Sequence, residues 1–525
     1  MISMGYARTL ASTGEFVWFP GAPRVQGFTN PLWTLWMAAI HRLGFDGSSA
    51  ALMISITGIA LILSSAFLIY GLVLAYANGQ KQLIAACAAA SIPFLYPLTF
   101  WTLRGMEVGL LTLLCLLLIR STIDCIASGE IKVRFLLILP IILGVATRFD
   151  FIVFCFVSIG AIFLWGEQRA RVRLAMTYLA VTLATATVVC FSQKLYWGSW
   201  LPNTYHLKMD GVTPVDRISR GVASSAKTLG LFVVIAIALY LNKKSKELHQ
   251  RLVLLASFNF IVMAAYSMYI GGDAWEGAMF NRFYATVLPL IPLTIALSFN
   301  TIRRWKTTVS LVAAVLIPSV GAGVSVNPFG FSSQHFEIVF VTAIVCGLLI
   351  LGMSLTQRPE LLTVSLIVTI CCVVSAYPTS QQFKKRDVLA TRTNLYVTET
   401  VETLQDVLLE KAVVATVWAG VPAYYLRQPM FDLLGKNDTQ IARSVPHGEF
   451  FPGHNKWDYD YSIGEVRPDV IFQTYTRDIE ENLDSRILAW GYTKKCTRSE
   501  TFPKKGIYFL TNSSNIKWNT LKECA

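Results

Sequence analysis

Long apolar runs separated by short polar connections make up most of the chain between residues 50 and 376. Each run holds roughly 15 to 28 residues, close to the number that a helix needs to cross a membrane. The pattern therefore predicts a polytopic α-helical membrane domain with about twelve transmembrane helices. The runs near Pro140 and after Asp150 are short and are expected to form a kinked or broken pair. The predicted crossings are 50–77, 83–100, 107–123, 135–147, 151–165, 174–192, 228–241, 252–270, 284–299, 307–324, 338–355 and 361–376.

Both ends of the chain differ from this pattern. Residues 1–26 begin with a short amphipathic stretch, ISMGYARTLAS, and residues 30–43 are apolar but too short to span. We expect the second stretch to lie at the membrane surface, with Trp33 and Trp36 at headgroup depth. Beyond residue 377, LEKAVVATVWAG, DVIFQTY and KGIYFLTN are typical of strands, and TETVETLQDVLLE is typical of an amphipathic helix.

Three parts are therefore predicted. Residues 1–46 form an outward loop with interfacial helices, residues 47–378 form the transmembrane domain, and residues 379–525 form an extracytoplasmic α/β domain.

Basic residues are concentrated in every second connection. The positive-inside rule places those connections in the cytoplasm and the others outside. The alternation also places Met1 outside, so that a further membrane helix is expected before it. The basic connections hold Lys81, Lys132 to Arg134, Arg169 to Arg173, Lys243 to Arg251, Arg303 to Lys306, and Arg358.

Composition agrees with a membrane protein and argues against nucleic-acid binding. Of the 525 residues, 54% are hydrophobic and 15% are charged, whereas soluble proteins carry about a quarter charged residues. The net charge of +13 lies largely in short loops, as the topology requires, rather than on one solvated, aromatic-studded face. Of the ten cysteines, only Cys496 and Cys524 lie in the polar C-terminal region, where they can pair if that region is outside the cytoplasm.

The outward connections hold the unusual polar residues. Ionisable groups so close to hydrocarbon are costly unless they are paired or line a cavity, although such residues also serve simply to anchor helix ends. Cations in an outward cavity suit a phosphate group, and a neighbouring carboxylate suits deprotonation of a hydroxyl. The stretches are RGMEVGL with Arg104 and Glu107, RFDF with Arg148 and Asp150, YWGSWLPNTYHLK with Asn203, Tyr205 and Lys208, and GGDAWEGAMFNRF with Asp273 and Arg282.

Together with the N-terminal stretch MISMGYARTLASTGEFVWFPGAPRVQGFTNPLW and, in the C-terminal region, VWAGVPAYYLRQPMFDLLGKNDTQIARS, PGHNKW and RPDVIF, these stretches resemble one family. The chain resembles the polyprenyl-phosphate-dependent GT-C glycosyltransferases, nearest the branch of the mycobacterial cell-wall arabinofuranosyltransferases. The resemblance implies transfer of a sugar from a polyprenyl-phosphate donor to an acceptor glycan, lipid or protein at the outer face of the inner membrane, without a cofactor. In agreement, no glycine-rich phosphate loop follows a predicted strand.

Each of these residues has a candidate role. Glu107 and Asp150 are the candidate catalytic acids, with substrate orientation as their alternative role, and Arg104 is a candidate substrate-binding residue. Arg148, Lys208 and Arg282 are expected to hold the donor phosphate. Asn203, Tyr205 and Asp273 are expected to line the sugar pocket.

One departure stands against these roles. The acidic pair that the family carries just before the stretch matching Met1 to Tyr6 lies outside this sequence, and it holds the presumed general base.

Two other interpretations stay open. A lipid-linked sugar flippase or transporter is the first, although no internal repeat of the kind that transporters carry is visible. A catalytically impaired relative is the second. No metal site is expected, because His447 and His454, with Glu449 and Asp458 nearby, follow no metal-binding spacing.

Overall fold

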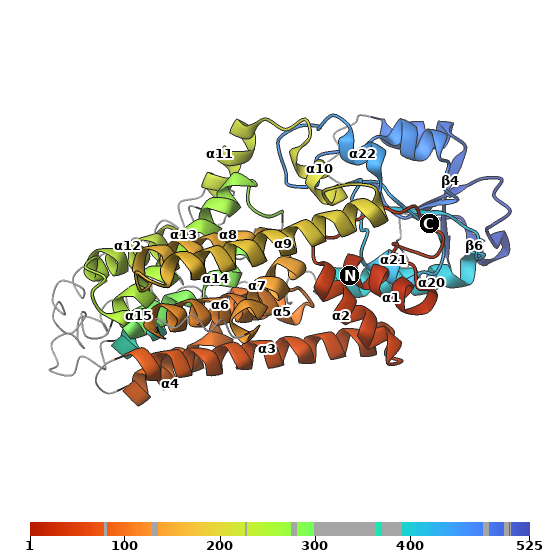
Figure 1. The fold of residues 1–525 in the computed structure, drawn as a ribbon. Coiled ribbons are helices and arrows are strands. Elements are labelled where there is room, and N and C mark those ends of the chain that lie inside the picture. The colour runs from red at the N-terminus through yellow and green to blue at the C-terminus, as the bar shows by residue number, and fades with distance from the viewer. Residues whose placement is uncertain are drawn as a thin grey trace. The chain divides into compact units, whose positions relative to one another are not determined.

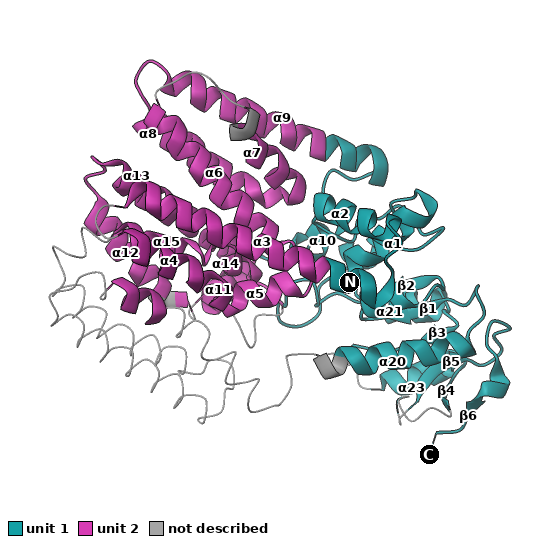
Figure 2. Ribbon diagram, turned by 90° about the horizontal axis from the view of Figure 1, so that it is seen from below, with its two compact units in different colours: residues 1–53, 190–213, 387–525 teal, residues 54–189, 214–386 magenta. Residues whose placement is uncertain are grey.

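A computed structural model describes residues 1–77, 81–128, 135–225, 228–274, 281–298, 363–369, 391–475, 482–497, 503 and 506–524. Figure 1 shows the fold as a ribbon. The chain divides into two compact units (Figure 2). Unit 1 holds residues 1–53, 190–213 and 387–525, and unit 2 holds residues 54–189 and 214–386. The N-terminal segment and the loop of residues 190–213 thus fall in the same unit as the C-terminal region, and the three parts expected from the sequence stay a prediction.

Unit 2 is helical. Within the described residues, four helices are long and apolar enough to span a membrane, or five when one bent pair is counted as a span. The predicted number of about twelve is therefore not confirmed, and the crossings at 307–324 and 338–355 lie outside the described residues. The four are α3 (Gly47–Tyr76), α6 (Val108–Ser128), α9 (Arg171–Trp197) and α13 (Leu248–Tyr269).

These four helices differ in burial. Within the 18-residue apolar stretch of each helix, 67% is buried inside the protein in α6 and 61% in α13. The buried share is 33% in α3 and 28% in α9. An apolar helix that is mostly exposed within its own protein is suited to face lipid. We therefore assign α6 and α13 to the interior of the helical domain and α3 and α9 to its lipid-facing side.

Prolines account for the shorter and broken helices. The predicted crossing 83–100 is a pair bent by 51°, with Pro93 and Pro97 at the break. The predicted crossing 284–299 is likewise interrupted, with Pro289 between its two halves. The remaining helices are α4 (Lys81–Ser91), α5 (Tyr96–Leu103), α7 (Phe135–Thr147), α8 (Ile152–Trp165), α11 (Pro214–Ser225), α12 (Leu229–Asn242), α14 (Arg282–Val287) and α15 (Leu290–Leu297).

Unit 1 contains a mixed sheet whose strand order, within its described part, is β2-β1-β3-β5-β4-β6. The first three strands are parallel, and β5, β4 and β6 add antiparallel pairs. The predicted strands and the amphipathic helix are confirmed by β1, β3, β5 and α20 (Thr391–Val407). The strands are β1 (Val414–Thr416), β2 (Met430–Asp432), β3 (Val470–Ile471), β4 (Tyr492–Thr497), β5 (Ile507–Leu510) and β6 (Leu521–Lys522).

The core of unit 1 joins segments that are far apart in sequence. Tyr6 of α1 (Ile2–Thr13) and Phe28 pack in the same apolar cluster as Val414 and Phe509 of the sheet. The helix expected at 30–43 is α2 (Pro31–Arg42). One expectation for it is wrong: Trp33 is 2% exposed and therefore lies inside the protein rather than at headgroup depth, whereas Trp36 is exposed.

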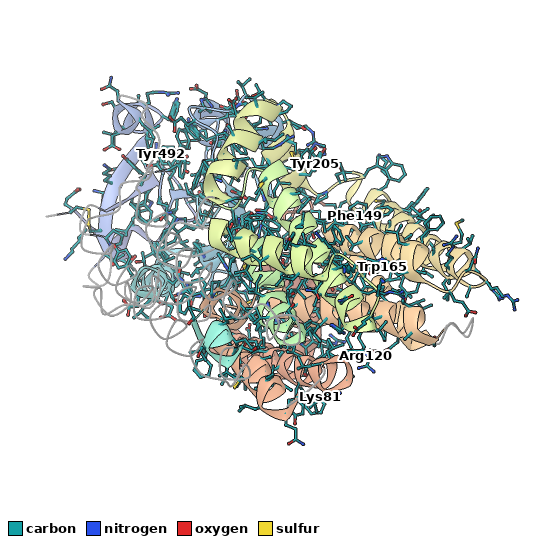
Figure 3. All side chains as sticks on the ribbon, turned by 90° about the vertical axis from the view of Figure 1, so that its left-hand side faces the viewer. Lys81, Arg120, Phe149, Trp165, Tyr205 and Tyr492 are labelled. Atoms are coloured by element: carbon teal, nitrogen blue, oxygen red, sulfur yellow. A yellow bond between two sulfur atoms is a disulfide. The ribbon has the colours of Figure 1, made fainter. Side chains whose placement is uncertain are left out.

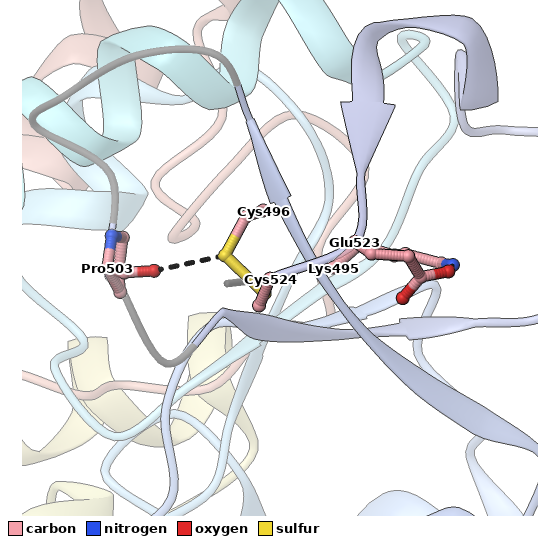
Figure 4. Close-up of a disulfide and its surroundings, with 5 residues drawn as sticks. All are labelled: Lys495, Cys496, Pro503, Glu523 and Cys524. Carbon is pink, nitrogen blue, oxygen red and sulfur yellow. Dashed lines mark hydrogen bonds and ion pairs between the residues drawn. A yellow bond between two sulfur atoms is a disulfide. The ribbon is translucent and has the colours of Figure 1, made fainter.

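A disulfide closes the far end of the sheet. Cys496 of β4 is bonded to Cys524, beyond β6, and the neighbouring Lys495 is ion-paired with Glu523 (Figure 4). The pairing expected from the sequence is thus present. It ties the last residues of the chain to β4.

Candidate functional site

Three of the charged residues singled out in the sequence form one buried network in unit 2. Arg148 donates through Nη1 to Glu107 Oε1 at 2.8 Å and through Nη2 to Asp150 Oδ2 at 2.6 Å. Its Nε donates to the same Asp150 carboxylate. The three side chains are at most 8% exposed. Arg148 is therefore occupied by two carboxylates, so its predicted role as a phosphate ligand would require it to release them.

Local sequence positions this network. Arg148 follows α7 in extended conformation and precedes a short 3-10 turn of Phe149–Phe151 that leads into α8. The ring of Phe151 lies so close to Gly144 that a Cβ at Gly144 would overlap it. Gly144 thus lets the turn fold back onto α7 and bring Asp150 to Arg148.

Tyr266 of α13 completes the network, and the sequence did not single it out. Its hydroxyl is hydrogen-bonded to Asp150. The sequence held one indication of this role, because Tyr266 lies near the C-terminal end of an apolar helix. A buried tyrosine hydroxyl there needs a hydrogen-bond partner. Tyr266 therefore connects α13 to the turn after α7.

A second ion pair in unit 2 joins Asp273 and Arg282. The Arg282 Nε lies 3.3 Å from Asp273 Oδ2, but this buried Nε–H has no acceptor in hydrogen-bond geometry among the described residues. Arg282 also interacts electrostatically with Glu107 and Asp150. Unlike Arg148, Arg282 therefore retains donor capacity beside a group of carboxylates.

Arg104 is placed differently. It ends α5, and its guanidinium lies 4.4 Å from the centre of the Phe100 ring. The structure thus brings together Glu107, Arg148, Asp150 and Arg282 in unit 2, and the role of Arg104 stays a prediction.

Asn203, Tyr205 and Lys208 belong to unit 1, on or at the ends of α10 (Asn203–Met209). The Asn203 amide nitrogen donates to the carbonyls of Gly435, Lys436 and Asp438 at 2.9 to 3.1 Å. Tyr205, which is labelled in Figure 3, is 39% exposed. Its ring packs edge-on against His206. Lys208 lies over Gly453. Asn203 thus holds the loop after β2, and its predicted contact with sugar stays a prediction.

The last residue of β2 and the loop that follows it, residues 432–438, form the centre of a polar junction in unit 1. Asp432 accepts hydrogen bonds from the backbone of Leu434 and from the backbone and side chain of Asn437, at 2.9 to 3.0 Å. The Tyr6 hydroxyl lies 2.8 Å from Asn437 Oδ1 and 2.6 Å from the Val25 carbonyl, and it accepts from Gly27 N. The N-terminal segment and the loop of Asn203 therefore meet at residues 432–438.

The charged groups of this junction are also coupled. Burial raises the pKa of Asp432, and the nearby Lys436 opposes that shift. Burial lowers the pKa of Lys436, and Asp432 opposes that shift in turn. Lys436 Nζ lies 3.3 Å from His454 Nε2, while His454 Nδ1 lies 2.9 Å from the Pro452 carbonyl. Because a carbonyl only accepts, Nδ1 carries the proton and Nε2 accepts from Lys436.

Gly27→Ala tests the junction. A Cβ at Gly27 would overlap Asn437 Oδ1 and lie 3.0 Å from the Lys436 carbonyl. We expect it to lower the free energy of unfolding by about 1–3 kcal/mol, as overpacking does. Thermal unfolding of the full chain in detergent measures the effect. The control is Gly160→Ala, because a Cβ added at Gly160 meets no atom within 4 Å. This substitution should be neutral or slightly stabilising.

The histidines that were weighed as metal ligands make other contacts. No group of three or more His, Cys, Asp or Glu side chains there is arranged to hold an ion. His447 stacks on Trp457 with ring centres 4.6 Å apart and bonds the Trp457 carbonyl, while His454 is engaged as above.

Comparison with known proteins gives the fold. Residues 385–514 match a family model described as a domain of unknown function, DUF8728. No curated protein matches the chain. ArnT from Cupriavidus metallidurans in the apo state is 12% identical, with a TM-score of 0.47 over 85% of this chain and 84% of that chain.

The structure of the same ArnT bound to undecaprenyl phosphate is 11% identical, with a TM-score of 0.50 over 98% of this chain and 93% of that chain. The arabinofuranosyltransferase branch is not confirmed, and the site residues stay predictions. What the second likeness establishes is the fold: the chain has the fold of ArnT, a GT-C membrane protein.

Proposed function

We propose that this protein is a membrane glycosyltransferase that moves a sugar from a polyprenyl-phosphate donor to an acceptor glycan, lipid or protein. The observation that carries the proposal is the likeness of nearly the whole chain to an ArnT structure holding undecaprenyl phosphate. The finer expectation, that the sugar is arabinofuranose or another pentose or hexose, rests on the sequence resemblance.

In this reaction, an acceptor hydroxyl oxygen forms a bond to the anomeric carbon of the sugar. The bond between that carbon and the phosphate oxygen breaks, and the polyprenyl phosphate leaves with the electron pair. The hydroxyl proton passes to a base. A preorganised cation beside the leaving phosphate stabilises the charge that develops there, so that neither a metal nor a nucleotide is required by the chemistry.

Arg282 is the residue that we assign to the leaving phosphate. It keeps a buried Nε–H outside hydrogen-bond geometry, whereas Arg148 is held by two carboxylates. Asp273 would then position Arg282. Glu107 and Asp150 gain a second role beside the predicted acid one, which is to hold Arg148.

The compartment is part of the proposal. We place unit 1 outside the cytoplasm, at the outer face of the inner membrane. The Cys496–Cys524 disulfide supports this placement, because disulfides persist in oxidising compartments and are rare in the cytosol.

Transfer from a labelled polyprenyl-phosphate sugar, measured on the purified full chain, tests the function. Arg282→Gln should lower kcat/KM by about 10- to 100-fold, because a charge-assisted contact made in the transition state is lost. Arg282→Lys should retain part of the activity.

The exposed Arg169 gives the control, since Arg169→Gln should stay within about twofold of the wild type. Transfer by Arg282→Gln at the wild-type rate would remove Arg282 from the site. Sugar that crosses vesicle membranes without forming a new glycosidic bond would overturn the transferase itself and favour a flippase.

A further inference from the structure

One face of α2 is apolar and exposed. The buried residues of this helix, among them Trp33, Met37 and Ile40, pack into unit 1. The residues of the opposite face recur every three or four positions, as residues on one side of a helix do. Leu35 and Trp36 are each 46% exposed, and Leu43 is 76% exposed. The members of this stripe, here called the α2 outer face, are Leu32, Leu35, Trp36, Ala39, Arg42 and Leu43.

A groove lies beside the C-terminal end of this face. It has a volume of about 540 Å³. It runs between residues 10–14, at the C-terminal end of α1, and residues Ala38, Ala39 and Arg42 of α2. Its lining is mostly small and apolar. Arg42 is exposed and donates to the Ala11 carbonyl at 3.0 Å. No carboxylate among the described residues pairs with Arg42, so the groove carries one uncompensated positive charge.

The position of α2 in the chain limits what can cover this face. Only residues 43–46 separate α2 from α3, a link that spans at most about 14 Å when extended. α3 has 30 residues and exposes Leu52, Ile56 and Phe67, as a lipid-facing helix does. The C-terminal end of α2 therefore lies within a few residues of the start of a membrane span.

We propose that the α2 outer face rests in the membrane surface and that the groove beside Arg42 binds an anionic phospholipid. The phosphate meets the Arg42 guanidinium, and an acyl chain lies along Ala39 and Leu43. Trp and Arg at the edge of an apolar helix face are the side chains that interfaces favour. A second copy of the chain is a poorer occupant, because six residues are few for the roughly 20–30 per side of a stable interface.

The test uses the full chain in nanodiscs of phosphatidylcholine with or without phosphatidylglycerol, extracted and weighed intact by native mass spectrometry. Wild type should retain phosphatidylglycerol in preference to phosphatidylcholine. Arg42→Gln should lower the retained phosphatidylglycerol about fivefold, the effect of one basic residue at an anionic surface. Ala39→Trp, which fills the groove, should lower it as well.

The matched control is Arg443→Gln, since Arg443 is another exposed arginine in the last turn of a helix that donates to a backbone carbonyl. It should leave retention unchanged. Equal retention of both lipids by wild type, or unchanged retention in Arg42→Gln, would overturn the proposal. So would a polyprenyl phosphate retained through Arg42, or a dimer that Leu35→Asp dissociates. If Arg42→Gln does not fold, two measurements still test the proposal: the retention of the two lipids by wild type and the retention by Ala39→Trp. Neither measurement depends on sugar transfer.

Discussion

Arg148→Met is expected to lower the free energy of unfolding by about 3–5 kcal/mol, the cost of breaking a buried ion pair by removing one partner. Glu107 and Asp150 are 2% and 7% exposed at the side chain, and both bond the same guanidinium. Without it, two buried carboxylates lose the guanidinium that both of them bond. The measurement is thermal unfolding of the purified full chain in detergent.

The network also predicts a rescue. Replacing all three members with neutral side chains of similar size, as in Arg148→Met with Glu107→Gln and Asp150→Asn, should recover most of the lost stability. For comparison, Arg486 and Asp460 form an exposed pair at 2.7 Å in unit 1. Arg486→Met should cost at most about 1 kcal/mol. An Arg148→Met protein as stable as wild type would show that the carboxylates do not depend on Arg148.

Within the described residues, hydrophobic patterning indicated where helices lie, since an apolar run of sufficient length must hydrogen-bond its own backbone in a membrane. Bends were harder, because a run that contains Pro93 and Pro97 has the composition of a single span. The division into units could not be predicted. Asn203 reaches carbonyls more than 230 residues away in sequence, and no local pattern marks such a contact.

Among the candidate residues, charge near hydrocarbon was a good guide to position and a poor guide to role. Glu107, Arg148 and Asp150 were singled out, and the structure brings them together. Their mutual pairing could not be anticipated, because partners 41 residues apart in sequence carry no shared periodicity. Tyr266 was missed for the same reason.

Lys456 was missed as well, since a lysine in a polar loop is ordinarily solvated. In the structure it is fully buried in unit 1. Its Nζ donates to the Ala442 carbonyl at 2.7 Å and to the His206 carbonyl at 3.2 Å. These carbonyls belong to the last turns of α22 (Thr439–Arg443) and α10, where carbonyls run short of intrahelical donors. The His206 carbonyl also accepts from the backbone N–H of Asp210 at 3.0 Å. Burial lowers the pKa of Lys456, and Asp210 opposes the shift.

Lys456→Met should therefore lower the free energy of unfolding by about 1–3 kcal/mol, because the Ala442 carbonyl loses this donor and the His206 carbonyl keeps the bond from Asp210, while the apolar stem is retained. The loss should appear in thermal unfolding of the full chain, and α10 should become more open to protease at the Tyr205 end. Lys517, which is exposed in the same unit, gives the control Lys517→Met, expected within about 0.5 kcal/mol of wild type. If Lys456→Met unfolds at the wild-type temperature, the ammonium is not what joins α10 to α22, and the apolar contacts of its stem suffice.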